Sequence, residues 1–155
     1  MKIISGNLLT SNVPVIVHQC NCFHTMGSGI AKILKEEYPE VYEADLTTKY
    51  GDRSKLGGFS IAEIKKGMSL KYVFNLYSQY NYGRGLKTDY EALEDGLAEI
   101  VYWCNLHHIK RIGLPYLIGC GLAGGDEKVV LAIIDKIQKE IPQVEIEIYK
   151  LENRG

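Results

Sequence analysis

Hydrophobic residues fall into two kinds of pattern along this chain. Short β-branched or alternating runs predict strands at residues 1–5, 13–20, 59–64, 72–77, 111–115 and 144–149. Between them, apolar residues recur at helical spacing and predict helices over residues 27–38, 41–50, 88–105 and 126–140. Strands that alternate with helices are typical of an α/β protein. We therefore predict a three-layer α/β/α fold that residues 1–155 form as a single domain.

Several residues mark where these elements begin and end. Pro39 is expected to stop the first helix, because proline cannot continue one. Thr88 and Glu91 form a capping-box pattern that predicts the start of the third helix, and Asp126 is expected to cap the fourth. The alternation over residues 144–149 is typical of a strand at the edge of a sheet.

Two glycine-rich loops are the most informative local feature. Residues 27–30 read Gly-Ser-Gly-Ile, and residues 119–125 read Gly-Cys-Gly-Leu-Ala-Gly-Gly. Each loop follows a predicted strand and leads into a predicted helix, whose first amides and dipole favour an anion. Glycine also lets the backbone approach a phosphate without a Cβ in the way. The two loops together predict a site for a ligand that carries a diphosphate; the alternative is that they serve only as turns.

Composition and charge restrict the range of partners. The chain has 155 residues, of which 46% are hydrophobic and 24% charged, as in ordinary globular proteins. A formal net charge of −1 argues against binding to long nucleic acid, which needs a basic stripe. The sequence contains no signal-peptide pattern and no apolar run of membrane-spanning length. We expect a cytoplasmic monomer with reduced cysteines, no membrane partner and no resident cofactor.

One cluster imitates a metal site. His18, Cys20, Cys22 and His24 alternate, so on one continuous strand all four side chains would point the same way. Alternate residues on a strand are about 6.6 Å apart, so the outer pair would be separated by about 20 Å, far beyond zinc-binding distances. Only a loop that begins after Cys20 could gather these side chains. We therefore expect no metal, and interpret His24 as a loop residue near the ligand.

Three segments together resemble the macrodomain family. They are Gly6-Asn7-Leu8 after the first strand, His18-Gln19-Cys20-Asn21-Cys22 through Gly27-Ser28-Gly29-Ile30-Ala31, and residues 114–122, which read Leu-Pro-Tyr-Leu-Ile-Gly-Cys-Gly-Leu. The likeness covers nearly the whole chain, in order. It implies a central mixed sheet and a site for ADP-ribose or a derivative. Within the family, the chain looks most like the branch that contains the terminal ADP-ribose protein glycohydrolases and the yeast-type ADP-ribose-1''-phosphate phosphatase.

The resemblance also implies which residues contact the ligand. Asn7 stands where the family usually places an aspartate that binds the adenine amino group, Asn21 matches a position near the distal ribose, and Leu151 lies by the adenosine end. The two glycine loops match the loops that wrap the diphosphate and the distal ribose. The implied ligand-binding residues are Asn7, Leu8, Asn21, Gly27, Ser28, Gly29, Ile30, Leu117, Ile118, Gly119, Cys120, Gly121, Leu122, Ala123 and Leu151. Tyr116, which enters the second loop, is the favoured residue for stacking on the ligand.

Catalysis follows less directly from the resemblance. The glycohydrolase members use a lysine that here falls on Ser78 or Gln79, and an aspartate that here is Ala123. Because an amide cannot form a Schiff base, that reaction would need Lys87 and Asp126 to fold back into those roles.

The resemblance fits a second reaction better, the hydrolysis of ADP-ribose-1''-phosphate. His18 matches a histidine implicated in the phosphatase, and Asp126 is a candidate general base. Each has a structural alternative: His18 as a hydrogen-bonded core residue and Asp126 as a helix cap. A further alternative is a non-catalytic protein that reads ADP-ribose.

Overall fold

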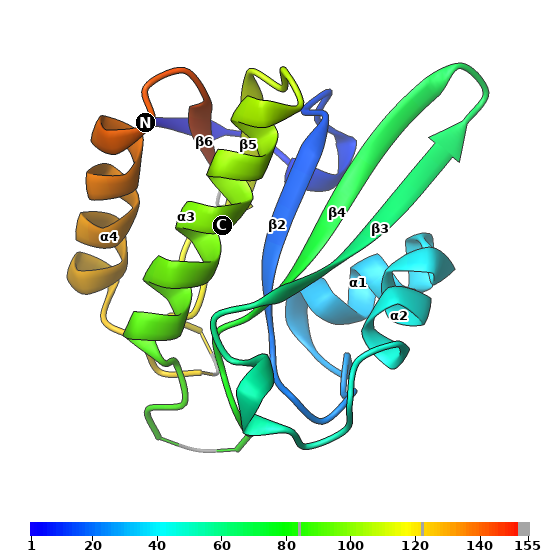
Figure 1. Cartoon of the computed structure of the whole chain (residues 1–155), viewed down its shortest axis with the longest axis vertical. Coiled ribbons are helices and arrows are strands. Elements are labelled where there is room, and N and C mark those ends of the chain that lie inside the picture. Colours follow the sequence, from blue (N-terminus) through cyan, green and yellow to red (C-terminus); the bar gives the residue numbers. More distant parts are fainter. Residues whose placement is uncertain (84, 122, 152–155) are drawn as a thin grey trace.

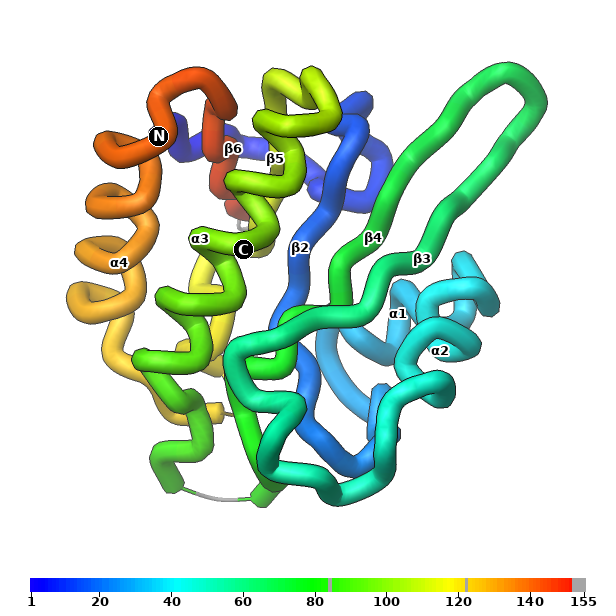
Figure 2. Tube along the Cα trace, viewed as in Figure 1, coloured from blue at the N-terminus to red at the C-terminus, as the bar shows by residue number. Residues whose placement is uncertain are grey.

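The structure, a computed structural model, describes residues 1–83, 85–121 and 123–151. Six strands form one sheet in the order β1-β6-β5-β2-β4-β3. The strands are β1 (Lys2–Ser5), β2 (Val15–Cys20), β3 (Phe59–Lys66), β4 (Ser69–Tyr77), β5 (Arg111–Pro115) and β6 (Glu145–Lys150). Neighbours pair in parallel except β3, which runs antiparallel to β4. The sheet is therefore mixed, as expected, and the β3–β4 hairpin extends beyond the neighbouring strands (Figure 2).

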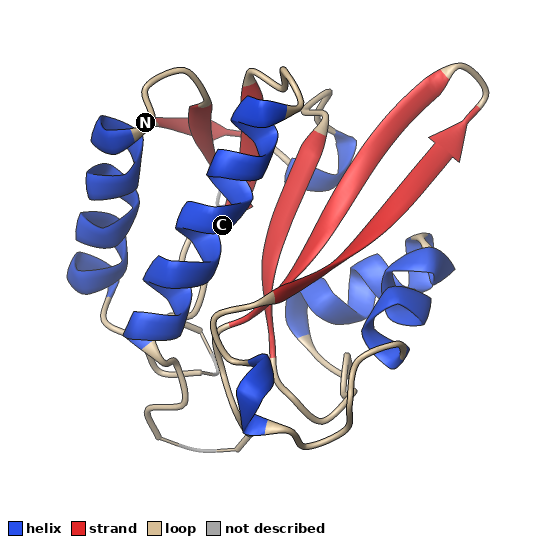
Figure 3. Cartoon of the chain, viewed as in Figure 1, coloured by secondary structure: helices blue, strands red, loops and turns tan. Residues whose placement is uncertain are grey.

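Helices cover both faces of this sheet, which gives the predicted three layers (Figures 1 and 3). They are α1 (Gly29–Glu37), α2 (Pro39–Leu46), α3 (Tyr90–Leu106) and α4 (Glu127–Glu140), with short 3-10 helices η1 (Leu8–Thr10) and η2 (Arg53–Lys55). One apolar core joins α3 and α4 to the sheet, and a second joins α1, α2 and η1 to the opposite face. Val15 and Val17 enter the first core and Ile16 and Cys20 the second, because successive strand side chains alternate between faces. No helix in the described ranges is both long and apolar enough to cross a membrane.

The prediction of an edge strand at residues 144–149 is wrong. Strand β6 lies between β1 and β5, and the edges of the sheet are β1 and β3. The alternation of apolar and charged residues indicated that Glu147 faces solvent, as on an edge strand. Glu147 is in fact only 5% exposed. Its carboxylate pairs with Arg111 at 2.8 Å and accepts a hydrogen bond from the Tyr149 hydroxyl. A buried carboxylate with such partners is compatible with an interior strand.

Two helix boundaries also differ from the prediction. The N-cap of α3 is Asp89, whose carboxylate accepts a hydrogen bond from the Ala92 amide, and not Thr88. Pro39 follows the end of α1, as predicted, and is also the first residue of α2. Proline is tolerated there because the first residue of a helix donates no helical hydrogen bond. Helix α2 consequently begins earlier than predicted and ends at Leu46. Asp126 caps α4 as expected, accepting from the Lys128 amide at 2.8 Å.

Gly96 in the middle of α3 lets this helix approach the sheet closely. A Cβ at this position would lie 2.3 Å from Cδ1 of Leu76 on β4 and 3.2 Å from the carbonyl oxygen of Gly57. The distance to Leu76 is far inside van der Waals contact, and the distance to the Gly57 oxygen is tighter than an ordinary contact. The small residue is thus required by packing, although glycine costs about 1 kcal/mol in a helix interior.

We predict that Gly96→Ala destabilises the protein by about 1–2 kcal/mol, because overpacking outweighs the gain in helix propensity. Urea unfolding followed by circular dichroism measures this change. Glu99→Ala, on the exposed side of the same helix, is the control and should change stability by less than about 0.5 kcal/mol. A Gly96→Ala protein that is more stable than the parent would contradict the packing argument.

Candidate ligand pocket

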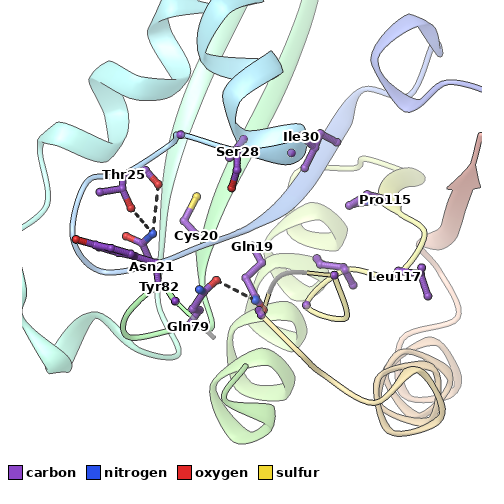
Figure 4. A pocket seen from close by; sticks show the side chains of 18 of the residues that line it. Gln19, Cys20, Asn21, Thr25, Ser28, Ile30, Gln79, Tyr82, Pro115 and Leu117 are labelled. Atoms are coloured by element: carbon purple, nitrogen blue, oxygen red, sulfur yellow. Dashed lines mark hydrogen bonds between the residues drawn. The ribbon is translucent and has the colours of Figure 1, made fainter. Parts of the chain in front are cut away.

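A pocket of about 750 Å³ opens where β5, β2 and β4 reach their carboxyl ends. These three strands are neighbours in the sheet and run parallel, so the loops that follow them meet at one edge. Figure 4 shows Asn21, Thr25 and Tyr82 on one side of the pocket and Pro115 and Leu117 on the other. The described lining residues are Gln19, Cys20, Asn21, Thr25, Gly27, Ser28, Gly29, Ile30, Ala31, Gln79, Tyr82, Gly83, Pro115, Tyr116, Leu117, Ile118, Gly119, Gly121 and Ala123.

The first wall is the loop after β2 together with the start of α1. Asn21 holds this loop: its side-chain amide donates to the Thr25 hydroxyl, and its oxygen accepts from the Phe23 amide at 2.9 Å. Ser28 occupies the N-cap position of α1 but makes no side-chain capping hydrogen bond. Gly29 has a φ of 57°, a conformation that glycine adopts without strain. The Ser28 hydroxyl is therefore free of a capping role beside the pocket.

The second wall is the loop after β5. Leu117 and Gly119 have φ values of 64° and 74°, and the amide of Gly125 donates to the Gly119 carbonyl at 2.8 Å. A Cβ on Gly119 would lie 2.9 Å from the Gln19 Oε1 atom and 3.0 Å from the Thr88 Oγ1 atom. Position 119 thus requires glycine for both its backbone conformation and its close neighbours.

Both walls present backbone amides to the pocket. In the described part of the chain, the amides of Gly27, Ser28, Gly119 and Gly121 have no hydrogen-bond acceptor. Gly29 and Ile30 open α1, and the amides of a first helical turn have no partner within the helix. Unpaired amides next to a helix N-terminus favour an anion. The two facing loops therefore form a cradle for a negatively charged ligand.

The described lining contains no Asp, Glu, Lys, Arg or His side chain. Its titratable groups are Cys20, Tyr82 and Tyr116. Burial raises the pKa of the Cys20 thiol well above its ordinary value, so the thiol stays protonated at neutral pH. The Tyr116 hydroxyl donates to the Glu127 carboxylate, and this bond raises the pKa of the tyrosine. An anion held by the described residues would be bound by dipoles rather than by ion pairs.

A hydrogen-bond network under the pocket joins three loops. The Gln19 oxygen accepts from the Ser78 hydroxyl at 2.6 Å, and its amide donates to Thr88 Oγ1 at 3.1 Å and to Gln79 Oε1 at 3.3 Å. The Thr88 hydroxyl then donates to the carbonyl of Gly119. Thr88, misjudged as a helix cap, instead connects the start of α3 to the second glycine loop. Gln19, which sequence reasoning left out of the site, is the centre of this network.

His18 lies in the core and outside the pocket lining. Its side chain is fully buried, and the Nε2 atom is 2.6 Å from Asn75 Oδ1. The Asn75 amide donates to the Val41 carbonyl and the Ser60 hydroxyl, so Oδ1 must accept and His18 must donate from Nε2. Burial lowers the pKa of His18 to about 4. His18 is therefore buried, neutral at pH 7 and absent from the described lining, and its catalytic role stays a prediction that this position does not support.

Some expected site residues lie outside the described lining. Asp126 caps α4, and the Asn7 side chain accepts from the Leu9 amide. The Cys120 thiol donates to the Ile118 carbonyl, and burial raises its pKa, which argues against an activated nucleophile. Leu8 is buried in η1 and Leu151 is exposed after β6. Leu122 lies outside the described residues.

The other expected ligand residues meet around the pocket. They are Asn21, Gly27, Ser28, Gly29, Ile30, Leu117, Ile118, Gly119, Gly121 and Ala123. Gln79, one of the two residues expected at the position of the family lysine, and Ala123, expected at that of the aspartate, also line it. The lining residues that were not assigned to the site from the sequence include Thr25 and also Cys20 and Pro115, which lie within the quoted macrodomain-like segments.

The chain does turn after Cys20, but the turn does not bring His18, Cys20, Cys22 and His24 together as a metal-binding group. The His24 Nε2 atom lies 2.8 Å from the Thr48 carbonyl oxygen, away from Cys20 and Cys22. Among the described residues, no group of three or more His, Cys, Asp or Glu side chains is placed to hold a metal ion.

Comparison with known proteins identifies the family. Residues 17–134 match the Macro domain family. A protein of Enterobacteria phage T4, named as an uncharacterized 17.5 kDa protein in the tk-vs intergenic region, is 35% identical over 144 residues, which cover 91% of this chain and 92% of that protein. The chain therefore belongs to the Macro domain family.

More distant relatives have names that describe an activity. The DNA ADP-ribosyl glycohydrolase of Thermus aquaticus is 24% identical over 150 residues, which cover 97% of this chain but only 41% of that protein. Among solved structures, the macrodomain of Mycobacterium tuberculosis DarG has a TM-score of 0.81 at 21% identity and covers 96% of this chain and 95% of its own. Thermosipho africanus DarTG in complex with ADP-ribose has a TM-score of 0.79 at 18% identity, and the match covers 99% of this chain and 42% of the DarTG chain. These structures share the fold.

The buried His18 makes stability depend on pH. Its folded pKa of about 4 lies below the ordinary histidine pKa of 6.5, so the unfolded chain binds more protons between these values and stability falls as the pH drops. We expect a loss of about 3 kcal/mol between pH 6.5 and 4 from this residue. Urea unfolding across this range measures it.

A matched pair of variants separates this effect from other titrations. His18→Gln should flatten the pH dependence over that window, and His108→Gln, which changes an exposed histidine, should leave it unchanged. Ring-proton NMR shifts give a second measure: His18 should remain neutral at about pH 5. Protonation of His18 near pH 6.5 in the folded protein would disprove the burial argument.

Proposed function

We propose that this chain binds ADP-ribose, or a molecule that carries ADP-ribose, in the pocket between the two glycine loops. The main support is the cradle of unpaired amides on both walls, which suits a diphosphate without any charged side chain. The cavity of about 750 Å³ lies within the range of small-molecule sites. Membership of the Macro domain family and the fold shared with a protein solved in complex with ADP-ribose support the same ligand.

The orientation of the ligand follows from the positions of the loops. In this proposal the diphosphate lies between Ser28 and Gly119, and the distal ribose lies toward Asn21. The adenosine end extends toward Asn7 and Leu151, which follow the parallel neighbours β1 and β6 at the same edge of the sheet. Asn7 already accepts from Leu9, but its side-chain amide remains able to donate or its oxygen to accept a second bond.

The chemistry of the glycohydrolase relatives does not transfer directly to this pocket. The position of the family lysine falls on Ser78 or Gln79 and that of the family aspartate on Ala123, and none of these can act as an amine nucleophile or as a carboxylic acid. Lys87 packs nearby: its Cε would lie 3.9 Å from a Cβ on Gly83, and its amide donates to the Ala123 carbonyl at 2.7 Å. A glycohydrolase reaction would therefore depend on Lys87, which is not part of the described lining.

Hydrolysis of ADP-ribose-1''-phosphate is the catalytic reaction that we propose. Phosphoryl transfer depends mainly on positioning and on stabilising charge, which an amide cradle supplies. Ser28, free of capping, and Asn21 are polar residues of the lining, and in this proposal they orient the attacking water. This is the reaction that the sequence resemblance to the branch with the yeast-type phosphatase predicts, whereas the relatives with an activity in their names are glycohydrolases. A non-catalytic reader of ADP-ribose is the outcome if no derivative is turned over.

For the ligand, we predict that Ser28→Val weakens the binding of ADP-ribose about tenfold, equivalent to about 1.4 kcal/mol. Valine suits the extended backbone of position 28 and removes no capping bond, but it fills the space beside the amides. Isothermal titration calorimetry measures the affinity. Ser69→Val, an exposed serine in the distant hairpin, is the matched control and should bind normally. Parent-like binding by Ser28→Val, or no heat from the parent at about 1 mM ADP-ribose, would overturn the proposed site.

For the reaction, we predict that the parent protein releases inorganic phosphate from ADP-ribose-1''-phosphate and that Ser28→Val slows this release at least about tenfold. A phosphate-release assay measures turnover, and ADP-ribosylated DNA serves as the comparison substrate. Release of ADP-ribose from that DNA, with an adduct trapped by borohydride and lost in Lys87→Gln, would instead favour a glycohydrolase. Binding of ADP-ribose without turnover of either substrate would indicate a non-catalytic ADP-ribose-binding protein.

A further inference from the structure

A group of aromatic side chains lies directly beside the pocket. We call it the aromatic rim, and it consists of Phe23, Tyr50, Tyr80 and Tyr82. Phe23 is its centre: its ring centroid lies 5.3 Å from that of Tyr50, 4.9 Å from Tyr80 and 6.5 Å from Tyr82. All three contacts are edge-to-face, with interplanar angles of 89°, 68° and 88°. Such contacts fix the rings relative to one another.

Two of the four rim residues are exposed, and one of these two also lines the pocket. Tyr50 is 66% exposed and Tyr82 59% exposed, although both rings pack edgewise on Phe23. Tyr82 itself lines the pocket, on the same side as Asn21 and Thr25 (Figure 4). A ligand in the pocket can carry a substituent that extends out of the pocket on this side. Such a substituent would contact the exposed rings of the rim. Neither ring is needed for the cradle of amides.

Backbone hydrogen bonds hold the rim in place. The Gly51 amide donates to the Cys22 carbonyl at 2.7 Å, and the Tyr80 hydroxyl donates to the Gly51 carbonyl at 2.8 Å. Gly51 has a φ of 70°, and a Cβ there would approach the Phe23 ring to 3.3 Å. The segments around Phe23, Gly51 and Tyr80 are thus locked together before any ligand arrives. A preorganised surface loses less entropy on binding.

Cationic side chains accompany the rings. Residues 49–55 read Lys-Tyr-Gly-Asp-Arg-Ser-Lys, which places three cations and one carboxylate in seven residues. The Arg53 guanidinium lies over the Tyr80 ring, 3.8 Å from its centroid, and Lys55 donates to the Cys22 carbonyl at 3.2 Å. The carboxylate of Asp52 is engaged by the Ser54 amide. The rim is therefore positive in a chain whose net charge is −1.

From this arrangement we infer that the aromatic rim binds the bases of a short single-stranded nucleic acid that carries the ADP-ribose group. Flat exposed rings accept bases by stacking, and adjacent cations hold the phosphates between them. Three cations can neutralise only a few phosphates, so the surface fits about one to three nucleotides and not a long strand. The attachment of the strand to ADP-ribose rests on one part of the proposed function, the binding of a molecule that carries ADP-ribose, and not on the phosphatase reaction. Binding of the strand by the rim rests on neither.

The test uses a fluorescein-labelled oligothymidylate of about six nucleotides without ADP-ribose, followed by fluorescence anisotropy at low salt. Tyr50→Ala should weaken its binding at least about fivefold, since stacking of one base contributes about 1–3 kcal/mol. Tyr102→Ala, which removes a tyrosine that is 57% exposed on α3, is the matched control and should bind like the parent. Neither tyrosine lies in the pocket, so calorimetry with free ADP-ribose should give parent-like affinity for both variants and confirm that each is folded.

Salt dependence gives a second readout of the same surface. For the parent, the logarithm of the binding constant should fall with that of the salt concentration with a slope of about −1 to −2, as expected for two or three phosphates on a single strand. Arg53→Gln should make this slope shallower, whereas Lys65→Gln in the hairpin should not.

Three results would overturn the inference. They are no oligonucleotide binding by the parent at about 1 mM protein, equal losses in Tyr50→Ala and Tyr102→Ala, or binding at the rim of a labelled Glu- and Tyr-rich peptide but not of the oligonucleotide. The last result would assign the rim to a protein partner. Failure of ADP-ribose binding with intact oligonucleotide binding would reject the proposed pocket ligand and leave the rim as a nucleic-acid site.

Discussion

The parallel pairing of β5, β2 and β4 is the constraint on which the site depends. It places the carboxyl ends of three strands side by side, with Cys20 opposite Tyr77 in the register of β2 and β4. The loops that follow are far apart in sequence, yet they close one pocket because parallel strands release them at the same edge. An antiparallel neighbour at this position would send one loop to the other end of the sheet. The only antiparallel strand in the described sheet, β3, lies at its edge and away from the pocket.

Close contact between the second glycine loop and the residues below it sets the shape of the cradle. The Gln19 and Thr88 side chains would lie about 3 Å from any Cβ at position 119, so the loop rests directly on their polar atoms. Through Thr88 the same network reaches the start of α3, and through Ser78 it reaches the end of β4. The loop conformation is therefore coupled to the sheet and to a helix, which keeps the amides oriented without a ligand.

Polar groups in the core are paired within the fold, whereas backbone amides in the described pocket are free to bind a ligand. His18, Asn75 and Glu147 are buried polar residues whose hydrogen bonds or ion pair lie within the fold. The described pocket, by contrast, lacks charged side chains but has unpaired amides. A pocket of this kind favours an anion through dipoles, and its polar side chains, such as Ser28 and Asn21, are neutral. The described lining therefore indicates the charge of the ligand, but it contains no acid, base or cation that would indicate a reaction.

The sequence alone determined the class of fold, most element positions, and the two loops that form the pocket, because hydrophobic period and glycine clusters are local signals. It could not place β6 inside the sheet, since the burial of Glu147 depends on Arg111, which is distant in the chain. Nor could it show that His18 faces the core while Gln19, its neighbour, supports the pocket. That choice depends on which face of β2 each residue occupies, and the face is decided by packing against α1 and α2 on one side and α3 on the other. The aromatic rim likewise exists only in the tertiary structure, because Phe23, Tyr50 and Tyr82 meet only when three separate loops fold together.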